Sequence, residues 1–337
     1  GGIRMYTPYK ARFDSDWYLG TADAVQQNFA FIKQSKPDTV LILSGDHIYS
    51  MDYDPMITFH RDHDADMTMA TIHVPPNEAS RYGIVGVEND YRVTSFIEKP
   101  KDPPSDLANM GVYLFNLDTL DKYLWEDHQN KNSSHDFGKD LLPKLVKEGK
   151  KVYAYPYSGY WVDVGTIQSY WQAHMDLLEN EPPLRLNDRS WVIHTRTEER
   201  PPVRIAKGAI VNDSMLSDGC IIEAGALVER CVLSPGVIIK AGAVVRQSIL
   251  LTDVTIGLNS KVEKSIIDKR VMVGENAVFG SISDHRITIA GKNSQIPAGA
   301  TIKPGATIAN DVVRSDYSSL TVEQDTTLET KRKPNEI

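Results

Sequence analysis

Residues 204–337 repeat short aliphatic segments at a fixed interval, and this repeat restricts the fold more than any other feature of the sequence. Segments such as IAKGAIV, IEAGALV and IKAGAVV place a Gly-Ala pair between aliphatic residues. Gly208, Gly225 and Gly242 are 17 residues apart, and so are Gly257 and Gly274. This interval is close to three hexapeptides, which is one turn of a three-sided solenoid. It therefore predicts a β-helix, in which each coil buries its aliphatic side chains against the next.

The rest of the chain lacks this repeat and is long enough for a second domain. A length of 337 residues is large for a single core. Residues 180–203 contain two Pro-Pro pairs and many charges, which is typical of a linker. We therefore expect one domain at 1–179, a linker at 180–203 and the β-helix at 204–337. Because terminal coils of a solenoid expose stacking surfaces, we also expect self-assembly.

Composition excludes several classes of function. A net charge of -8 disfavours a surface for nucleic acid or anionic membranes, since these need excess Lys and Arg. No apolar stretch approaches the length of a membrane span. Cys220 and Cys231 are too few for a disulfide framework, so we expect buried free thiols in a cytoplasmic protein. The opening GGIRMYTPYK has no start methionine, which leaves a lost targeting segment as an alternative.

The segment VLILSGDHIY at 40–49 places an acidic residue, Asp46, directly after an apolar run in the first domain. Its apolar run predicts a strand buried on both faces of a parallel sheet. Asp46 would follow the carboxyl end of that strand, where ligands bind in open α/β sheets. Upstream, GTADAVQQNFAFIKQS predicts a helix with Thr21 as its N-cap.

Further elements follow from the same patterns. We expect two strands joined at Asn89-Asp90, a strand at NMGVYLFN, and a helix at HDFGKDLLPKLVKEGK that ends at Gly149. A short strand and turn at GYWVDVGT lead into a second helix. Its apolar side chains recur at helical spacing and indicate core packing, namely Ile167, Tyr170, Trp171, His174, Met175 and Leu178.

Few residues outside the repeat suggest chemistry. Asp46 and Asp163 both follow or end strands, and two such carboxylates can hold Mg²⁺ together with substrate phosphates. The alternative for each is a turn aspartate that accepts backbone hydrogen bonds. Lys99 in FIEKP could neutralise a phosphate and Glu98 could accept from hydroxyls, although an exposed ion pair is the alternative. We interpret HRDHDAD at 60–66 as solvated surface instead of a zinc site. No nucleophile-elbow pattern occurs.

These motifs, taken in order, carry a resemblance. WYLGTADAVQQN, LILSGDHIYSMDY, YGIVGV, FIEKP, NMGVYLF, HDFGKDLLP and GYWVDVGTIQSYWQAHMDLL, followed by the repeat, resemble the glucose-1-phosphate adenylyltransferase (ADP-glucose pyrophosphorylase) family of sugar nucleotidyltransferases. SGDH and EKP are shared across sugar nucleotidyltransferases, whereas GTADAVQQN, HDFGKDLLP and DVGT together are specific to this branch. The resemblance implies a Rossmann-like α/β domain followed by a left-handed parallel β-helix.

The resemblance also implies an activity and its residues. The reaction would join ATP and glucose 1-phosphate into ADP-glucose and pyrophosphate with Mg²⁺, in a homotetramer. Asp46 and Asp163 match the metal ligands, and with Lys99 they match the catalytic set. The implied substrate-binding residues are Tyr18, Gly83, Glu98, Lys99 and Asn109, where Asn109 replaces a common serine. The implied nucleotide-binding residues are Gly20, Thr21, Ala22 and Gly45.

One family motif has no counterpart in this sequence. The family opens with a glycine-rich strand-to-helix loop that cradles the triphosphate, whereas Gly1-Gly2 leads into other residues. We therefore expect a catalytic domain without its N-terminal part. A non-catalytic regulatory subunit or fragment of the same family is the alternative. An acyltransferase fits less well, because His285 is the sole histidine after residue 203 and lies in an irregular stretch.

Overall fold

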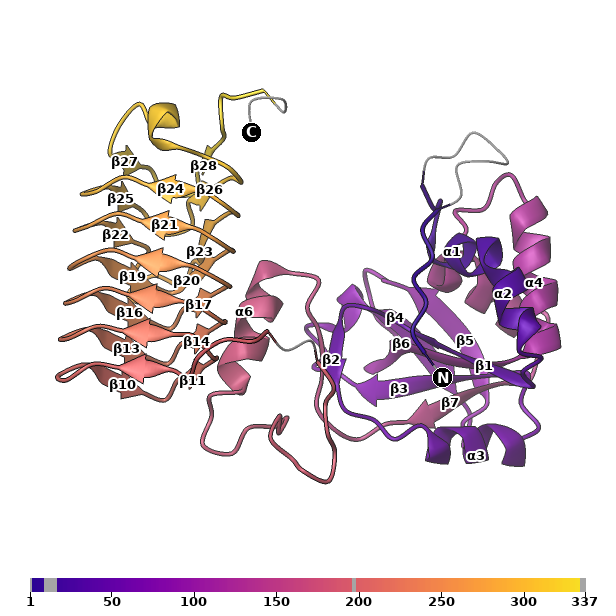
Figure 1. Ribbon diagram of the computed structural model, residues 1–337. Coiled ribbons are helices and arrows are strands. Elements are labelled where there is room, and N and C mark those ends of the chain that lie inside the picture. Colours follow the sequence, from indigo (N-terminus) through magenta and orange to yellow (C-terminus); the bar gives the residue numbers. More distant parts are fainter. Residues whose placement is uncertain (1, 9–16, 196–197, 334–337) are drawn as a thin grey trace. The chain divides into compact units, whose positions relative to one another are not determined.

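A computed structural model describes residues 2–8, 17–195 and 198–333, which form two compact units (Figure 1). The first unit comprises Gly1–Gly45 and Ser50–Gly159, and the second comprises Asp46–Tyr49 and Tyr160–Ile337. None of the described helices combines the length and apolar character needed to cross a bilayer. The division into 1–179, 180–203 and 204–337 stays a prediction.

The first unit is built on a six-stranded mixed sheet with the order β5-β4-β6-β3-β7, in which β1 also pairs with β6. Among the described residues of this sheet, β3 and β7 run parallel and the other pairs are antiparallel. Strands β4 and β5 form the hairpin expected around Asn89-Asp90. The strands are β1 (Thr39–Leu43), β3 (Met67–His73), β4 (Gly83–Val87), β5 (Val93–Glu98), β6 (Leu107–Asn116) and β7 (Val152–Pro156).

The expectation for the first strand was wrong. Among the described residues, β1 pairs only with β6, antiparallel, with Val40 opposite Phe115. Its residues are half-buried and Leu43 is exposed. A run of aliphatic residues predicts a strand, but it does not indicate whether the neighbouring strand runs parallel or antiparallel. Asp46 nevertheless follows the carboxyl end of β1, as expected.

Helices pack on the sheet according to their apolar faces. One core contains Phe29, Phe115, Leu124 and Leu145, which come from α2, β6, α4 and α5. Helix α3 contacts β3 and β7 and lies on the other face of the sheet (Figure 1). The helical segments are α1 (Thr21–Gln27), α2 (Phe29–Gln34), α3 (Asp54–Asp62), η1 (Ala79–Arg81), α4 (Leu117–Gln129), the π-helical η2 (Phe137–Leu141) and α5 (Leu142–Lys147).

Two predicted helices differ in detail from the structure. The segment after Gly20 forms α1 and α2, which are separated at Asn28, and Gly20 is the N-cap, so the assignment of this role to Thr21 was wrong. The Thr21 hydroxyl instead donates to the Asp136 carboxylate at 3.0 Å. The segment HDFGKDLLPKLVKEGK begins with the π-helical turn η2 before α5. Gly149 has φ +71° just beyond α5, consistent with its predicted role as the stop.

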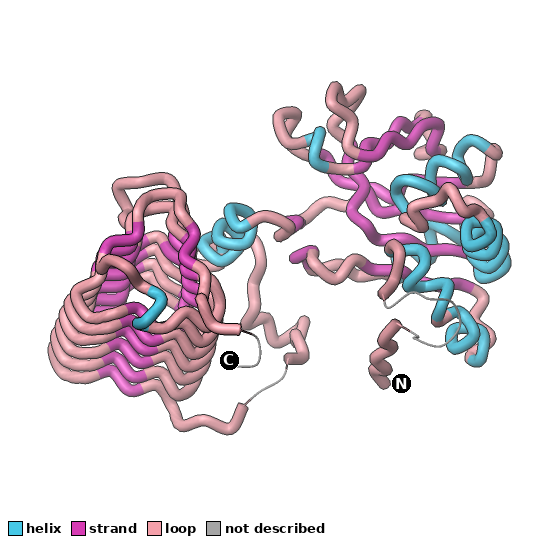
Figure 2. Tube along the Cα trace, turned by 90° about the horizontal axis from the view of Figure 1, so that it is seen from above, coloured by secondary structure: helices cyan, strands magenta, loops and turns pink. Residues whose placement is uncertain are grey.

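The second unit contains the expected parallel β-helix (Figures 1 and 2). Its strands stack into three parallel sheets around an aliphatic core. The first sheet is β10 (Ile210–Asn212), β13 (Leu227–Glu229), β16 (Val244–Arg246), β19 (Lys261–Glu263), β22 (Val278–Phe279), β25 (Thr301–Ile302) and β27 (Thr321–Val322). The second is β11 (Met215–Leu216), β14 (Val232–Leu233), β17 (Ile249–Leu250), β20 (Ser265–Ile267), β23 (Thr288–Ala290), β26 (Thr307–Ile308) and β28 (Thr327–Leu328). The third is β9 (Arg204–Ile205), β12 (Ile221–Ile222), β15 (Ile238–Ile239), β18 (Thr255–Ile256), β21 (Met272–Val273) and β24 (Gln295–Ile296). A short 3₁₀ turn, η3 (Arg314–Asp316), follows β26.

The coil length equals the sequence interval. Ile210 lies beside Leu227, and Leu227 lies beside Val244, each 17 residues apart. Gly208, Gly225 and Gly242 adopt φ of +82°, +69° and +66° at one corner of successive coils. Glycine suits this corner because it adopts the left-handed region without a steric penalty. The period of the sequence is therefore the period of the stacked coils.

Before the β-helix, the described residues of the second unit form a small ribbon and one helix. Strand β2 (His47–Tyr49) pairs antiparallel with β8 (Trp161–Asp163), and α6 (Ile167–Asp176) follows. Trp171 and Met175 of α6 pack against Ile249 and Ile266 of the β-helix. The core packing predicted for α6 is confirmed at these residues, whereas Ile167 is 50% exposed.

Candidate functional site

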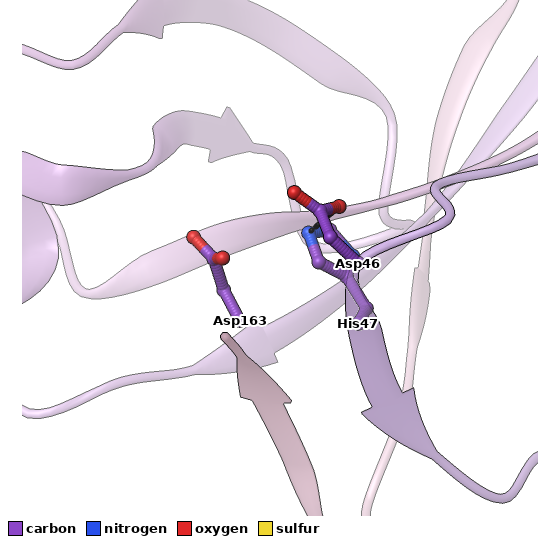
Figure 3. A group of neighbouring side chains, drawn as sticks. All are labelled: Asp46, His47 and Asp163. Atoms are coloured by element: carbon purple, nitrogen blue, oxygen red, sulfur yellow. Dashed lines mark ion pairs between the residues drawn. The ribbon is translucent and has the colours of Figure 1, made fainter. Parts of the chain in front are cut away.

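Asp46, His47 and Asp163 gather on the β2–β8 ribbon of the second unit (Figure 3). His47 lies opposite Asp163 in the register, and Asp46 precedes β2. One ligand atom from each residue lies within 4.8 Å of the others. In the described part of the chain, this is the one group of three or more His, Cys, Asp or Glu with that geometry. The two aspartates that the sequence analysis singled out are thus neighbours in space.

Local backbone geometry fixes Asp163. The Gly165 amide donates to Asp163 Oδ1 at 2.7 Å, and the Val164 amide donates to the Asp46 carbonyl at 3.2 Å. A Cβ on Gly165 would lie 2.9 Å from Asp163 Oδ1, so glycine permits this tight turn. Thr166 then caps α6 through the Ser169 amide at 3.1 Å. The carboxylate is therefore held between a strand and a capped helix.

The donor set of this group suits a hard divalent cation. Asp46 is 64% exposed, whereas the His47 side chain is 13% exposed and its Nε2 lies 3.6 Å from Asp46 Oδ1. The His47 ring packs edge-on against Trp161, with 5.1 Å between ring centroids. Carboxylate oxygens open to solvent can bind a metal ion while leaving positions for water or phosphate. His47 was not predicted as a site residue, although its place beside Asp46 in SGDH was a visible signal.

In the first unit, Glu98 and Lys99 lie at the end of β5. Glu98 is opposite Gly83 in the register, and Lys99 has φ +47°, which is unusual for a residue with a side chain. The Lys99 ammonium is 65% exposed and lies 3.8 Å from Glu98 Oε1. Burial raises the pKa of the Glu98 carboxyl, and the Lys99 charge offsets part of this effect. Lys99 therefore offers an accessible cation beside a half-buried acid.

Glycine residues make room for the Glu98 carboxylate. A Cβ on Gly138 would lie 2.7 Å from Glu98 Oε2, and one on Gly83 would lie 2.8 Å from the same atom. The Asp136 and Lys139 charges also act on Glu98. Asp136 and Gly138 belong to HDFGKDLLP, a motif that carries the family resemblance but was not predicted to contribute to the site. Such contacts join residues far apart in the chain, so spacing alone did not reveal them.

The other predicted site residues of the first unit have ordinary partners. Asn109 Nδ2 donates to the Tyr113 hydroxyl at 2.7 Å, and the Tyr18 hydroxyl accepts from Asn28 at 2.9 Å. Ala22 is fully buried, whereas Gly45 has open space where a side chain would project. The structure therefore contains every predicted site residue, and the substrate roles of these residues stay predictions.

The segment HRDHDAD is not a metal cluster in the described residues. His60 is 2% exposed, so the expectation of solvated surface was wrong for this residue. Its ring nitrogens lie 2.8 Å from Thr68 Oγ1 and 3.1 Å from Asn116 Oδ1. Burial lowers the pKa of His60. A buried imidazole with two neutral partners is a structural group.

Comparison with known families identifies the first part of the chain. Residues 7–180, more than half of the sequence, match the family model described as "Nucleotidyl transferase". The chain belongs to the nucleotidyl transferase family. Residues 202–288 match the model described as "GlmU-like, C-terminal hexapeptide", which agrees with the repeat and the β-helix. The expected fold class, a nucleotidyltransferase domain followed by a parallel β-helix, is confirmed.

Alignments with curated relatives of this nucleotidyl transferase family member cover 66% of its length. It is 49% identical over 222 residues to a glucose-1-phosphate adenylyltransferase of Desulforamulus reducens, covering 66% of this chain and 56% of the relative. Identity is 49% over 223 residues to the enzyme of that name from Bacillus thuringiensis, and 48% over 222 residues to that from Clostridium botulinum. These alignments cover 66% of this chain, and 59% and 58% of the two relatives.

Proposed function

We propose that this chain catalyses adenylyl transfer from ATP to α-D-glucose 1-phosphate, giving ADP-glucose and pyrophosphate for glycogen or starch synthesis. The observation that carries the proposal is the 49% identity to relatives that are named glucose-1-phosphate adenylyltransferases. The convergence of Asp46 and Asp163 supports it, because phosphoryl chemistry of this kind depends on a carboxylate-bound cation. We further propose a cytoplasmic location.

The residue roles belong to the same proposal. Asp46 and Asp163 would hold Mg²⁺, whose chemistry is to neutralise the phosphate oxygens of the nucleotide. Lys99 would bind the phosphate of the sugar, and Glu98 would accept from its hydroxyls. Tyr18, Gly83 and Asn109 would complete the sugar site. The nucleotide would contact Gly20, Thr21, Ala22 and Gly45.

This chemistry requires few catalytic groups. A phosphate oxygen of glucose 1-phosphate attacks the α-phosphorus of ATP, while the bond from that phosphorus to the bridging oxygen of the β-phosphate breaks and pyrophosphate leaves. The attacking oxygen is already anionic, so no general base is needed. The protein must align the two anions and offset their charge. An accessible lysine such as Lys99, 65% exposed, is suited to this task.

We also propose that the chain assembles as a homotetramer. The first coil of the β-helix exposes apolar side chains, since Ile205 and Ile210 are each 53% exposed. Exposed strand edges and apolar residues at a solenoid end favour association. Light scattering coupled to size-exclusion chromatography should give a mass of four chains, and a monomeric mass would contradict this part of the proposal.

The decisive experiment measures pyrophosphate release with Mg²⁺ and glucose 1-phosphate. ATP, UTP, dTTP and GTP are compared, with both this chain and the longest chain that its gene encodes. Release with ATP in preference to the other nucleotides is expected. If neither chain releases pyrophosphate from ATP, the activity is excluded and the non-catalytic subunit becomes the better assignment.

A further inference from the structure

A carboxylate and an imidazole form a shielded pair in the first unit, outside the proposed substrate contacts. Asp127, in the last turn of α4, has a side chain that is 8% exposed, and that of His135 is 12% exposed. Asp127 Oδ2 lies 2.7 Å from His135 Nδ1, and Ser133 Oγ donates to Asp127 Oδ1 at 2.6 Å. Such groups are costly to bury and are retained where their hydrogen bonds fix a geometry.

One member of the pair, His135, has an unfavourable backbone conformation. His135 has φ +55°, in the left-handed region that residues with side chains seldom adopt. Its amide donates to Ser133 Oγ at 2.9 Å. The ring of His135 therefore contacts Asp127, and its backbone is bound to Ser133, which itself donates to Asp127. Local conformations of this kind persist only where surrounding contacts determine them.

This conformation directs the His135 carbonyl at the start of α1. The carbonyl accepts from the Ala22 amide at 2.9 Å and from the Asp23 amide at 3.4 Å. A Cβ on Gly20 would lie 2.3 Å from the same oxygen, so glycine is needed for this approach. The segment from Gly20 to Asp23 is therefore positioned by its contacts with the His135 carbonyl.

The neighbouring residues of the same loop extend toward Glu98. Asp136 accepts from the Thr21 hydroxyl at 3.0 Å, and the Phe137 amide donates to Thr21 Oγ1 at 3.1 Å. Gly138 contacts the Glu98 carboxylate closely, since its Cβ would lie 2.7 Å from Oε2. Residues 133–138 thus touch both the proposed nucleotide segment and the proposed sugar acid.

We propose that Asp127 and His135 are a positioning pair that presents the Gly20–Ala22 segment to the nucleotide, an inference that rests on the proposed function. The pair touches neither substrate. It acts through the His135 carbonyl, which sets the position of the nucleotide segment. Because that segment binds the nucleotide equally in the ground state and the transition state, its displacement raises the KM for ATP more than it lowers kcat.

The test uses variants that preserve shape. Asp127→Asn keeps the volume and the acceptor oxygen but removes the charge. His135→Asn removes the ring, and asparagine tolerates the left-handed region. Each single variant should raise the KM for ATP by about tenfold, the scale of one charge-assisted hydrogen bond, with kcat changed less than about threefold. The double variant should be no worse than the more impaired of the two singles, because the residues act as one unit.

Asp121→Asn is the matched control. This aspartate is also on α4 and pairs with Lys33 of α2, but its side chain is 40% exposed. An exposed ion pair contributes little, so the KM for ATP should stay within about twofold of the parent value. An equal rise in Asp121→Asn and Asp127→Asn would indicate general loosening of α4 and would overturn the positioning role.

A second readout does not require activity. Hydrogen exchange at the Ala22 and Asp23 amides should accelerate in Asp127→Asn and His135→Asn, while exchange in β6 stays unchanged. Failure of the proposed function would appear as a silent parent chain, and the exchange result then decides the inference alone. Parent-like exchange at both amides, or an active parent with variants of equal KM, would overturn it.

Discussion

Lys99 is the residue whose removal tests the proposed sugar-phosphate site most directly. Its ammonium is 65% exposed, so it is accessible to a phosphate. Lys99→Ala should weaken glucose 1-phosphate binding by about 1.5–3 kcal/mol, the scale of a hydrogen bond to a charged group. The measurement is the KM for glucose 1-phosphate at saturating ATP. Lys101→Ala, an exposed lysine two residues later, is the control. An unchanged KM in Lys99→Ala would remove this residue from the site.

Asp163 should matter for catalysis but not for folding. Asp163→Asn keeps an oxygen that can accept from the Gly165 amide, so the turn before α6 is preserved. It removes one anionic metal ligand, and activity should fall by at least about 100-fold, the upper figure for losing a group that only supports a ligand. Mn²⁺ binding, followed by electron paramagnetic resonance, should weaken in parallel. Tight Mn²⁺ binding by both Asp46→Asn and Asp163→Asn would show that the metal is held elsewhere.

Glu98 makes stability depend on pH in a defined direction. Burial raises its pKa in the folded state, so between the unfolded and folded values the folded chain holds more protons than the unfolded chain. The Glu98 contribution to the free energy of unfolding therefore falls as pH rises through the folded pKa. Glu98→Gln lacks this titration, so its stability relative to the parent should be higher at pH 7 than at pH 4. Urea unfolding at both values measures the difference, and a pH-independent difference would contradict the burial argument.

Helix α6 connects the metal-site strand to the β-helix. Trp171 Nε1 donates to the Gln247 carbonyl at 2.8 Å, and the Lys264 ammonium lies 5.3 Å from the Trp171 ring centroid. Trp171→Phe should cost about 0.5–1.5 kcal/mol, because it removes one hydrogen bond to the carbonyl of the half-buried Gln247. Trp171→Ala should cost about 3–5 kcal/mol. Thermal unfolding of the purified chain measures both.

The same substitutions test whether α6 supports Asp163. Only three residues separate Asp163 from the start of α6, so movement of the helix should displace the carboxylate. Trp171→Ala should therefore raise the Mg²⁺ concentration needed for half-maximal activity. Ile167→Ala is the control, since Ile167 is 50% exposed on the same helix. A stable Trp171→Ala variant with parent-like Mg²⁺ dependence would separate the helix from the site.

Elements with a strict period were the ones that sequence could predict. The 17-residue interval predicted the coil of the β-helix because each coil repeats the same environment. Two predictions were wrong where a neighbour distant in sequence decided the outcome. Strand β1 meets an antiparallel β6, and His60 is buried by partners on β3 and β6. Asp46 and Asp163 were found because each follows or ends a short strand, whereas His135 and Gly138 act through backbone approach that leaves no periodic signal.

At the scale of the whole molecule, the reactivity of the two thiols measures how readily the β-helix opens. Cys220 and Cys231 are free and fully buried, which confirms the expectation for these residues. Burial raises the pKa of Cys231 to about 12, so almost no thiolate exists at neutral pH. Modification by a disulfide reagent at pH 8 should therefore require opening of a coil. In 6 M guanidinium chloride, both thiols should react at once.

The labelling rates of the two thiols, compared with the rate of global unfolding, test how the coils open. Solenoid coils contact mainly their neighbours, so opening should begin at an end and spread inward. Cys220 precedes β12 and Cys231 precedes β14, and these strands pair with β9 and β11 of the first coil, so both thiols lie one coil from this end. Variants with Cys231→Ala and with Cys220→Ala should thus both label faster than the whole chain unfolds. Equal rates that track global unfolding would mean that the β-helix opens as one cooperative unit, and labelling within seconds in native buffer would contradict the burial of both thiols.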